Sequence, residues 1–366
     1  MLGKGEPDLN EIRVAIAGVG NCASALIQGV EYYKNAKEGE FVPGLMHVNF
    51  GGYHVRDIKF VAAFEVNKLK IGKDLSEAIF AEPNCCAKFA EVPKLGVEVL
   101  PGPVLDGVAP HMHKAFKTYN EERFSVDVVE TLKAVEADML VNFLPVGSRE
   151  ATRFYANACL EAGCAFVNCI PEFIATNPDW ARKFELKGLP VAGDDIKSQL
   201  GATILHRSIV NLCLNRGVIV DETYQLNLGG NTDFLNMTVE ERLKTKRISK
   251  TEAVTSLVPY KVPTRIGPSD YVPFLGDEKI CYIYLKGRKF GDQPVRIVVK
   301  LEVEDSPNSA GMAIDVIRAV KLALDRGISG PLISISAYAF KHPPIQVPDS
   351  TAKEWVEEYI KGKRER

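Results

Sequence analysis

The chain has 366 residues, and its 45 lysines and arginines nearly balance 47 aspartates and glutamates, giving a formal net charge of -2. Without an excess of positive charge or a long basic run, we expect no nucleic-acid partner. The length suits two lobes that share a cleft, because one domain usually holds about 100–200 residues.

The N-terminal segment and the cysteines predict a cytoplasmic protein without a membrane partner. Residues 1–8 form no apolar leader, and no stretch approaches the roughly 18 apolar residues that cross a bilayer. The eight cysteines include no CxxC pair, so we expect reduced thiols that lie mostly in the core. The adjacent Cys85 and Cys86 leave a metal or redox site as the less favoured alternative.

Predicted strands and helices alternate through the first 200 residues. Short apolar runs predict strands, and segments with helical periodicity predict the helices between them. The strands are Arg13–Gly18, Ile58–Phe64, Met139–Leu144, Ala165–Ile170 and Leu189–Ala192, and the helices are Cys22–Tyr33, Lys68–Phe80, Val126–Ala137, Arg149–Ala162 and Asp179–Leu186. Such alternation predicts a doubly wound, Rossmann-type α/β domain with a mainly parallel sheet.

The pattern changes after Ser198. A long predicted helix runs to Arg216, and strand-like runs then follow without crossover helices between them, which predicts an α+β lobe. These strands are Thr223–Leu228, Ile280–Leu285 and Val295–Val303, and the helix Gly311–Arg326 comes next. We therefore predict a nucleotide-binding domain of residues 1–200 and 311–366, and a catalytic and oligomerisation domain of residues 201–310.

A glycine-rich turn joins the first predicted strand to the first predicted helix. Backbone N–H groups at such a helix N-terminus can bind a pyrophosphate, although a Gly-x-Gly sequence can also be a simple tight turn. Glu65 ends the second strand, where a carboxylate can bind the ribose hydroxyls and favour NAD over NADP; the alternative is an ordinary exposed carboxylate. The cofactor candidates here are Gly18, Gly20, Asn21, Cys22 and Glu65. Residues 34–56, between turn and carboxylate, form either a wall of the site or a surface excursion.

Two later turns follow strands of the same predicted sheet. Asn142, Pro145 and Ser148 follow one strand, and Asn168 ends the next. The carboxyl ends of parallel strands meet at one edge of the sheet, so we expect these residues to contact cofactor or substrate. Local turn caps explain the polar residues equally well.

Asp194, Asp195 and Lys197 lie where the last apolar run of the first half ends. Two carboxylates beside an ammonium group can fix the protonation state of the lysine and hold it against a substrate. The alternative is an acidic N-cap of the following helix.

A polar loop with Asn231 and Asp233 precedes a basic segment that contains Lys246 and Lys250. These two lysines are four residues apart, so they share one face if the segment is helical. Like charges on one face are unfavourable unless an anion lies there, and phosphate is the natural candidate; the alternative is a solvated basic face. No histidine pattern predicts a zinc site, so the metal ligands stay unknown.

Together these segments resemble the inositol-1-phosphate synthase family, in particular its bacterial and archaeal branch, from about Ile12 to Pro344. The stretches that carry the resemblance begin at Gly18, Val42, Gly193, Leu228, Lys246, Glu304 and Ala337. The resemblance implies that NAD oxidises C5 of glucose 6-phosphate, a proton leaves C6, the enolate attacks the C1 aldehyde, and NADH reduces C5 again. It also implies a homotetramer, and a divalent cation as a helper.

Matching the family's motifs residue by residue assigns roles to this sequence. The implied catalytic residues are Lys246, Lys250, Lys341, Asp195, Asp233 and Lys197. Asn168 and Asn231 join the three lysines Lys246, Lys250 and Lys341 in substrate binding, and Asp194, Asp195 and Asp305 join the cofactor contacts. The eukaryotic branch has a further lysine where this chain has Gln293-Pro294, so its role is either absent or taken by Lys286 or Lys289.

Two other functions remain open at this point. An NAD-dependent sugar-phosphate dehydrogenase of the same two-lobe plan accounts for the first half of the chain, but not for the lysine cluster. An NAD-sensing regulatory subunit accounts for nucleotide binding without turnover.

Overall fold

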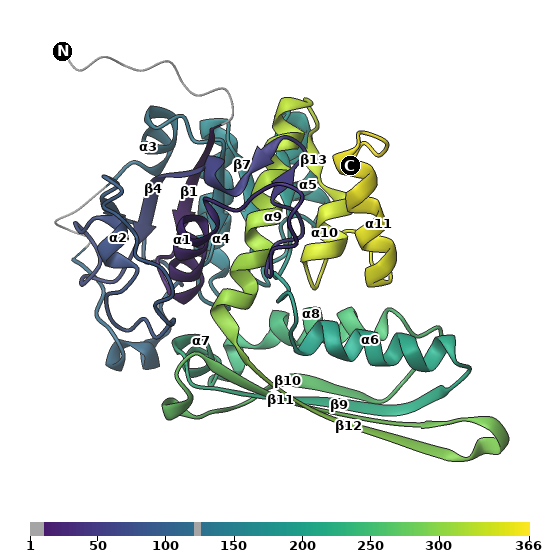
Figure 1. Ribbon diagram of the computed structural model, residues 1–366. Coiled ribbons are helices and arrows are strands. Elements are labelled where there is room, and N and C mark those ends of the chain that lie inside the picture. Colours follow the sequence, from purple (N-terminus) through teal and green to yellow (C-terminus); the bar gives the residue numbers. More distant parts are fainter. Residues whose placement is uncertain (1–10, 121–125) are drawn as a thin grey trace, which may run out of the picture.

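The computed structural model describes residues 11–120 and 126–366. The expectation about an N-terminal leader concerns residues 1–8, which lie outside these ranges. The chain forms a larger lobe around one sheet and a smaller lobe around a second sheet below it (Figure 1).

The larger lobe contains a seven-stranded parallel sheet with the order β13-β8-β7-β6-β1-β4-β5. The strands are β1 (Ile12–Ala17), β4 (Ile58–Glu65), β5 (Val99–Pro101), β6 (Met139–Asn142), β7 (Ala165–Asn168), β8 (Pro190–Ala192) and β13 (Gly330–Pro331). The chain builds outward from β1 in both directions, so the strand order reverses between β1 and β6. That reversal opens a crevice at the carboxyl ends of the strands, where sheets of this kind bind ligands.

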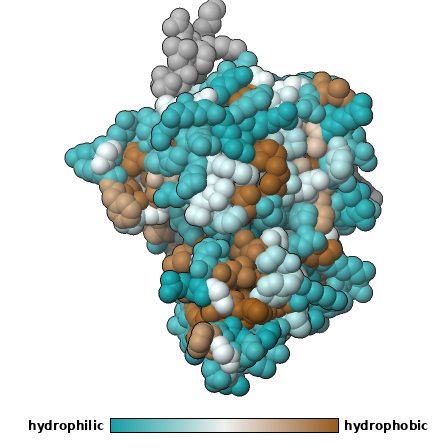
Figure 2. Space-filling model, turned by 90° about the vertical axis from the view of Figure 1, so that its right-hand side faces the viewer, coloured by the Kyte–Doolittle hydropathy of each residue, from teal (hydrophilic) through white to brown (hydrophobic). Residues whose placement is uncertain are grey.

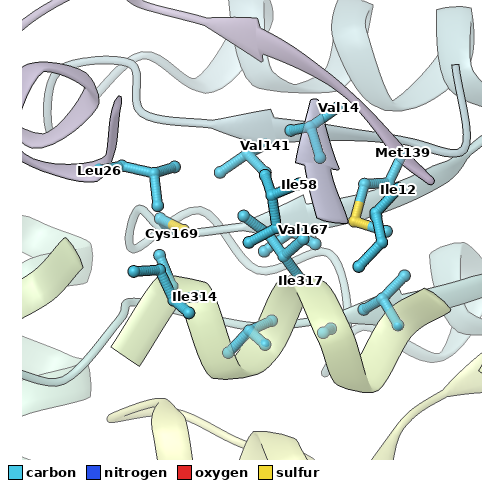
Figure 3. Close-up of a cluster of buried hydrophobic side chains, with 14 of the residues drawn as sticks. Ile12, Val14, Leu26, Ile58, Met139, Val141, Val167, Cys169, Ile314 and Ile317 are labelled. Carbon is cyan, nitrogen blue, oxygen red and sulfur yellow. The ribbon is translucent and has the colours of Figure 1, made fainter. Parts of the chain in front are cut away.

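Helices cover both faces of this sheet. One face carries α1 (Asn21–Tyr33), α9 (Asp305–Asp325), α10 (Ile333–Ala339) and α11 (Asp349–Ile360), and the other carries α3 (Val128–Ala134), α4 (Arg149–Ala162) and α5 (Pro178–Leu186). Ile314 and Ile317 of α9 pack toward Val141 and Val167 of the sheet (Figure 3). Burying one such side chain stabilises the fold by about 1.5–3 kcal/mol, so α9 anchors the return of the chain from the second lobe. The predicted doubly wound architecture is confirmed.

The predicted helix Lys68–Phe80 is wrong over most of its length. The structure contains turns there and one short helix, α2 (Leu75–Ala78), whose N-terminus Asp74 caps. Gly72 has a φ of +80°, a left-handed conformation that ends any helix started before it. Apolar spacing alone did not reveal this break.

Residues 34–56 pack against α9, and none of them borders either of the two cavities described below. The segment contains the small hairpin β2 (Asn49–Phe50) and β3 (Tyr53–His54). Buried Arg318 of α9 donates to the carbonyl oxygens of His47 at 2.8 Å and Val48 at 2.9 Å. The segment is therefore a packed excursion that contributes to the core.

The second lobe is a four-stranded mixed sheet with the order β10-β9-β11-β12. Its strands are β9 (Ile219–Gly229), β10 (Thr264–Tyr271), β11 (Glu278–Arg288) and β12 (Pro294–Glu304). The helices α6 (Ala202–Asn215) and α8 (Lys244–Thr255) cover one face, and α7 (Thr232–Asn236) lies at the junction with the first lobe. The predicted α+β lobe is confirmed, but β10 was not predicted because Gly267-Pro268 resembles a turn. An edge strand tolerates such a proline.

Across residues 11–120 and 126–366, no helix combines the length and apolar character that a bilayer crossing requires.

Candidate active site

A deep cavity lies between the two lobes at the carboxyl edge of the parallel sheet. The first lobe contributes the turn around Gly20, the segment Asp195–Ile196 and Lys341, and the second lobe contributes α8 and the loop at Asn231–Asp233. A neighbouring cavity extends from Gly20 toward Glu65 and Lys70. The two cavities share the glycine turn as a common border, so they form one continuous site.

The glycine turn is shaped by steric limits on its backbone. Gly18 has a φ of +91°, and a Cβ there would lie 2.8 Å from the carbonyl oxygen of Phe143. Gly20 precedes α1, whose N-terminus has no side-chain cap, and a Cβ at Gly20 would meet no atom within 4 Å. The first glycine is therefore required by the fold, while the second leaves open space where a phosphate can approach the helix N-terminus.

Glu65 supports this turn from the next strand. Its carboxylate accepts hydrogen bonds from the N–H groups of Val19 at 2.8 Å and Val66 at 2.7 Å. The ammonium group of buried Lys70 donates to the carbonyl oxygen of Val19. Glu65 still borders the second cavity, so its predicted contact with ribose stays a prediction.

One buried carboxylate joins the two lobes at the centre of the main cavity. Asp195 accepts hydrogen bonds at one oxygen from Lys246 and Lys341, each at 3.0 Å, and at the other from Ser249. Burial by itself raises the pKa of Asp195, but Lys246, Lys341 and Ser249 outweigh it and hold the pKa below its usual range. Asp195 therefore favours its ionised form and contacts two ammonium groups from different lobes.

The lysines around Asp195 differ in their electrostatic surroundings. Burial lowers the pKa of Lys341 to about 8, with Asp195 opposing this shift and the neighbouring Lys246 adding to it. Burial also acts on Lys246, but Asp195 and Asp233 outweigh it and raise its pKa. Lys341 can thus gain or lose a proton near neutral pH, whereas Lys246 stays charged.

Lys250 lies one helical turn beyond Lys246 and also borders the cavity. Within the described part of the chain its ammonium group makes no hydrogen bond and no ion pair. Burial lowers its pKa strongly, and the positive charges of Lys279 and Lys246 add to this effect. An anionic ligand beside a buried lysine with a lowered pKa stabilises its charged form and so raises the pKa toward the usual value.

Comparison with known proteins identifies the family. A sequence model described as Myo-inositol-1-phosphate synthase matches residues 201–306. The inositol-3-phosphate synthase of Corynebacterium glutamicum is 56% identical over 357 residues, which cover 95% of this chain and 98% of that protein. The chain belongs to the myo-inositol-1-phosphate synthase family.

Other relatives agree over nearly the full length. The inositol-3-phosphate synthase of Mycobacterium tuberculosis is 55% identical over 355 residues, covering 96% of each chain. Among solved structures, a myo-inositol-1-phosphate synthase-related protein from Thermotoga maritima is 26% identical and covers 97% of this chain and 100% of its own, with a TM-score of 0.80. The family's fold therefore extends over both lobes.

Lys279 is a fourth cavity lysine that sequence reasoning missed. It lies at the start of β11, borders the cavity and forms a 2.8 Å ion pair with Asp305 at the start of α9. The two lysines considered for such a role lie elsewhere: Lys286 is 3.9 Å from Glu222, and Lys289 is exposed. The sequence contained one indication of this position. Lys279 follows Gly276 closely, and a strand begins there near the junction of the two lobes.

The loop around Asn231 has a mixed role. The side-chain oxygen of Asn231 caps α7 by accepting from the N–H groups of Asp233 at 3.1 Å and Phe234 at 3.2 Å. Its amide donates at 3.1 Å to the buried Asp277, which also accepts from Ser306. Asn231 and Asp233 both border the cavity, so their predicted contacts with substrate remain open.

Three predicted contact residues form a buried chain behind the cavity wall. Asn142 donates to Asn168 at 2.9 Å, and Asn168 donates to Asp194 at 2.7 Å. Asp194 also accepts from the backbone N–H groups of Ile174 and Ala175 at 3.1 Å. None of the three borders either cavity, so the structure assigns these side chains to the support of the strand ends.

Ser148 is likewise buried behind the wall, and its hydroxyl donates to Pro145 at 2.7 Å. Pro145 itself borders the cavity, as do Asn21 and Cys22.

Lys197 departs most clearly from its predicted position. The side chain is fully buried and turned away from the cavity, with its ammonium group 2.9 Å from the carbonyl oxygen of Ala337 and 3.1 Å from Asp349. Neither Asp194 nor Asp195 contacts it. The expected cluster of two carboxylates around one lysine therefore does not form. Asp194, Asp195 and Lys197 each contact a different set of residues.

Metal-binding groups are sparse in this site. Outside residues 1–10 and 121–125, no set of three or more histidine, cysteine, aspartate or glutamate side chains is arranged to hold a metal ion. None of the eight cysteines forms a disulfide in this structure, and five of them are buried, which agrees with the expected core positions.

Proposed function

We propose that this chain converts D-glucose 6-phosphate to 1L-myo-inositol 1-phosphate, the same molecule as 1D-myo-inositol 3-phosphate, with NAD as a cofactor that is not consumed overall. The observation that carries the proposal is the cluster of four lysines around Asp195 and Asp305 in a cavity that borders a nucleotide-type glycine turn. The relatives of more than half identity, named inositol-3-phosphate synthases, supply the reaction.

The cofactor fits the first lobe. The N-terminus of α1 has no side-chain cap and would receive the pyrophosphate, and Glu65 borders the adjoining cavity where a ribose would lie. Bound NAD would accept a hydride from C5 and later return it, which is why the redox balance closes within one turnover.

The lysine cluster suits the charges that develop on the substrate. The substrate carries a phosphate dianion, and removal of a proton from C6 creates an enolate that attacks the C1 aldehyde. Lys246 stays protonated beside Asp195 and stabilises negative charge, while Lys250 and Lys279 provide further ammonium groups. Lys341, with a pKa of about 8, is the best suited to move the proton of the C5 hydroxyl.

A divalent cation at this site would bind to the carboxylates of the cavity. The carboxylates of Asp195, Asp233 and Asp305 border the cavity, but within the described part of the chain they are not arranged as a set that could hold a metal ion. A cation here would need substrate oxygens to complete its coordination.

Incubation of the pure protein with glucose 6-phosphate and a catalytic amount of NAD, with and without EDTA, tests the proposal. We expect an inositol monophosphate in excess over NAD, without net NADH. Stoichiometric NADH would instead indicate a sugar-phosphate dehydrogenase, and nucleotide binding without any product would indicate a regulatory subunit. The EDTA arm reports the need for a cation.

We also propose a cytoplasmic homotetramer. The free cysteines suit a reducing compartment. The outer face of the second sheet exposes Tyr224 and Val298, which flank Tyr284 in register, and apolar surface gathers on this lobe in the side view (Figure 2). Such a face favours association between copies. Sedimentation of the Val298→Asp variant should show smaller assemblies than the parent, and an unchanged assembly would exclude this face.

A further inference from the structure

A second charge network lies directly behind the segment that carries Asp195. Lys197 and Arg207 are fully buried, and both contact Asp349 at the start of α11, at 3.1 Å and 2.7 Å. The lysine ammonium also donates to Ala337, four residues before the cavity lysine Lys341. A buried cation of this kind requires fixed partners, so the network constrains every segment that it contacts.

The same network reaches the helix that carries the other cavity lysines. Arg207, on α6, donates to the carbonyl oxygen of Ala253 near the end of α8, and also to the side chain of Gln346. Gln346 in turn donates to the carbonyl oxygen of Lys341 at 2.7 Å. Continuous hydrogen bonds therefore connect α8, which carries Lys246 and Lys250, to the segment that ends at Lys341.

We propose that Lys197, Arg207 and Asp349 are positioning residues that set the separation of α8 from residues 337–341, and so place the cavity lysines of both lobes around Asp195. The expected effect on kcat rests on the proposed function. It assigns Lys197 a role through other residues, because its ammonium group does not reach the cavity.

The network also acts on Lys341 through charge. Lys197 and Lys341 repel each other, and burial and Arg207 hold the pKa of Lys197 at about 8. The charged groups that face Lys341 itself are Asp195 from its own lobe, Lys246 and Lys250 of α8, Lys279 of β11 and Asp305 of α9, with the thiol of Cys169 also near. Removing the charge of Lys197 takes away one repulsion, which should raise the pKa of Lys341.

The first test is Lys197→Met, which removes the ammonium group but leaves Asp349 paired with Arg207. We expect kcat to fall by up to roughly a hundredfold with little change in KM, because a displacement of about 1 Å is enough for such a loss. The pH dependence of acetic anhydride labelling at Lys341, followed by mass spectrometry, should shift to higher pH. A merely structural role would change neither kcat in the folded protein nor this labelling midpoint.

Lys321→Met is the matched control. Lys321 is a partly buried lysine on α9 that pairs with Asp138 and Asp325 and borders neither cavity. We expect a similar loss of thermal stability but unchanged kcat and unchanged labelling of Lys341. If Lys197→Met behaves like this control, the proposal is overturned.

Gln346→Leu keeps the proposal testable if Lys197→Met does not fold. This half-buried side chain connects Lys341 to Arg207 without carrying charge, so its loss should lower kcat more than it raises KM. An unchanged kcat in this variant would contradict the positioning role. Failure of the proposed function can be told apart from failure of this inference. If the wild-type protein makes no inositol phosphate, the proposed function is wrong, but the labelling of Lys341 can still be compared between the variants because it needs no turnover.

Discussion

Asp195 and Lys197 are two residues apart, yet they belong to charge networks of opposite character. Around Asp195 and Asp305, four lysines and three carboxylates border an open cavity, and Lys250 has no hydrogen-bond or ion-pair partner among the described residues. Around Lys197, the cations meet Asp349, Ala337 and the other oxygens that Arg207 contacts. The first network leaves Lys250 available to an anion from solution, whereas the cations Lys197 and Arg207 of the second network already contact oxygen atoms.

This difference shows how catalytic lysines can be told from structural ones in one protein. Both networks contain buried lysines with a lowered pKa, since Lys341 and Lys197 each lie near about 8. A shifted pKa therefore does not distinguish them. What distinguishes them is whether the ammonium group borders the cavity, which only the three-dimensional arrangement reveals.

The strongest expected effect comes from the cavity network. Lys341→Ala or Lys246→Ala should lower kcat by roughly 10²–10⁴, the range for removal of a general acid–base or electrostatic group. NAD affinity, measured by calorimetry, should change little because the glycine turn is untouched. Lys244→Ala is the control on the same helix, at an exposed position, and should keep full activity. Full activity in either variant would contradict the view that the lysines bordering the cavity are catalytic and those of the other network are structural.

Asp195→Asn should sharpen the comparison through pH. The carboxylate raises the pKa of both Lys246 and Lys341, so its neutral replacement lets burial lower both values further. The limb of the pH–rate profile that belongs to Lys341 should then move from about pH 8 to lower pH, the opposite direction to Lys197→Met. A profile that stays in place, in a variant shown to be folded by circular dichroism, would mean that Asp195 does not control these lysines.

Lys279→Ala tests whether the cavity extends to the start of β11. We expect kcat/KM to fall by roughly tenfold or more, because an ammonium group beside the substrate's anionic groups is lost. Lys286→Ala, on the same strand but paired at 3.9 Å with Glu222 outside the cavity, should change it less than about twofold. Equal losses of kcat/KM in the two variants would indicate that the lysines of β11 act only through their positive charge, without a specific contact between Lys279 and the substrate.

The glycine turn should give the smallest effects, and its two glycines should differ. Gly18→Ala forces a Cβ toward Phe143 at a positive φ, so we expect a loss of about 1–3 kcal/mol in stability, measured by denaturant unfolding. Gly20→Ala meets no atom within 4 Å, so stability should hold while NAD binds more weakly. Normal NAD affinity in a folded Gly20→Ala protein would place the pyrophosphate elsewhere.

The sequence by itself predicted the features that depend on local pattern. Alternating apolar runs and helical periods predicted the doubly wound sheet, and the glycine turn was found because a Gly-x-Gly sequence between an apolar run and a helical period is a local signal. Motifs also pointed to Asp195, Lys246, Lys250 and Lys341, which the structure brings together in one cavity. Their roles in the reaction remain predictions.

Tertiary structure decided which side chains face the cavity. In an extended segment Asp195 and Lys197 would share one face, but Asp195 has a φ of +62°, and the chain turns there so that the two side chains separate. Lys279 reaches the cavity because β11 pairs between β9 and β12, a long-range arrangement with no local pattern. Residue type and spacing determined what this protein can bind, and packing between distant segments decided which residues are left unpaired to do it.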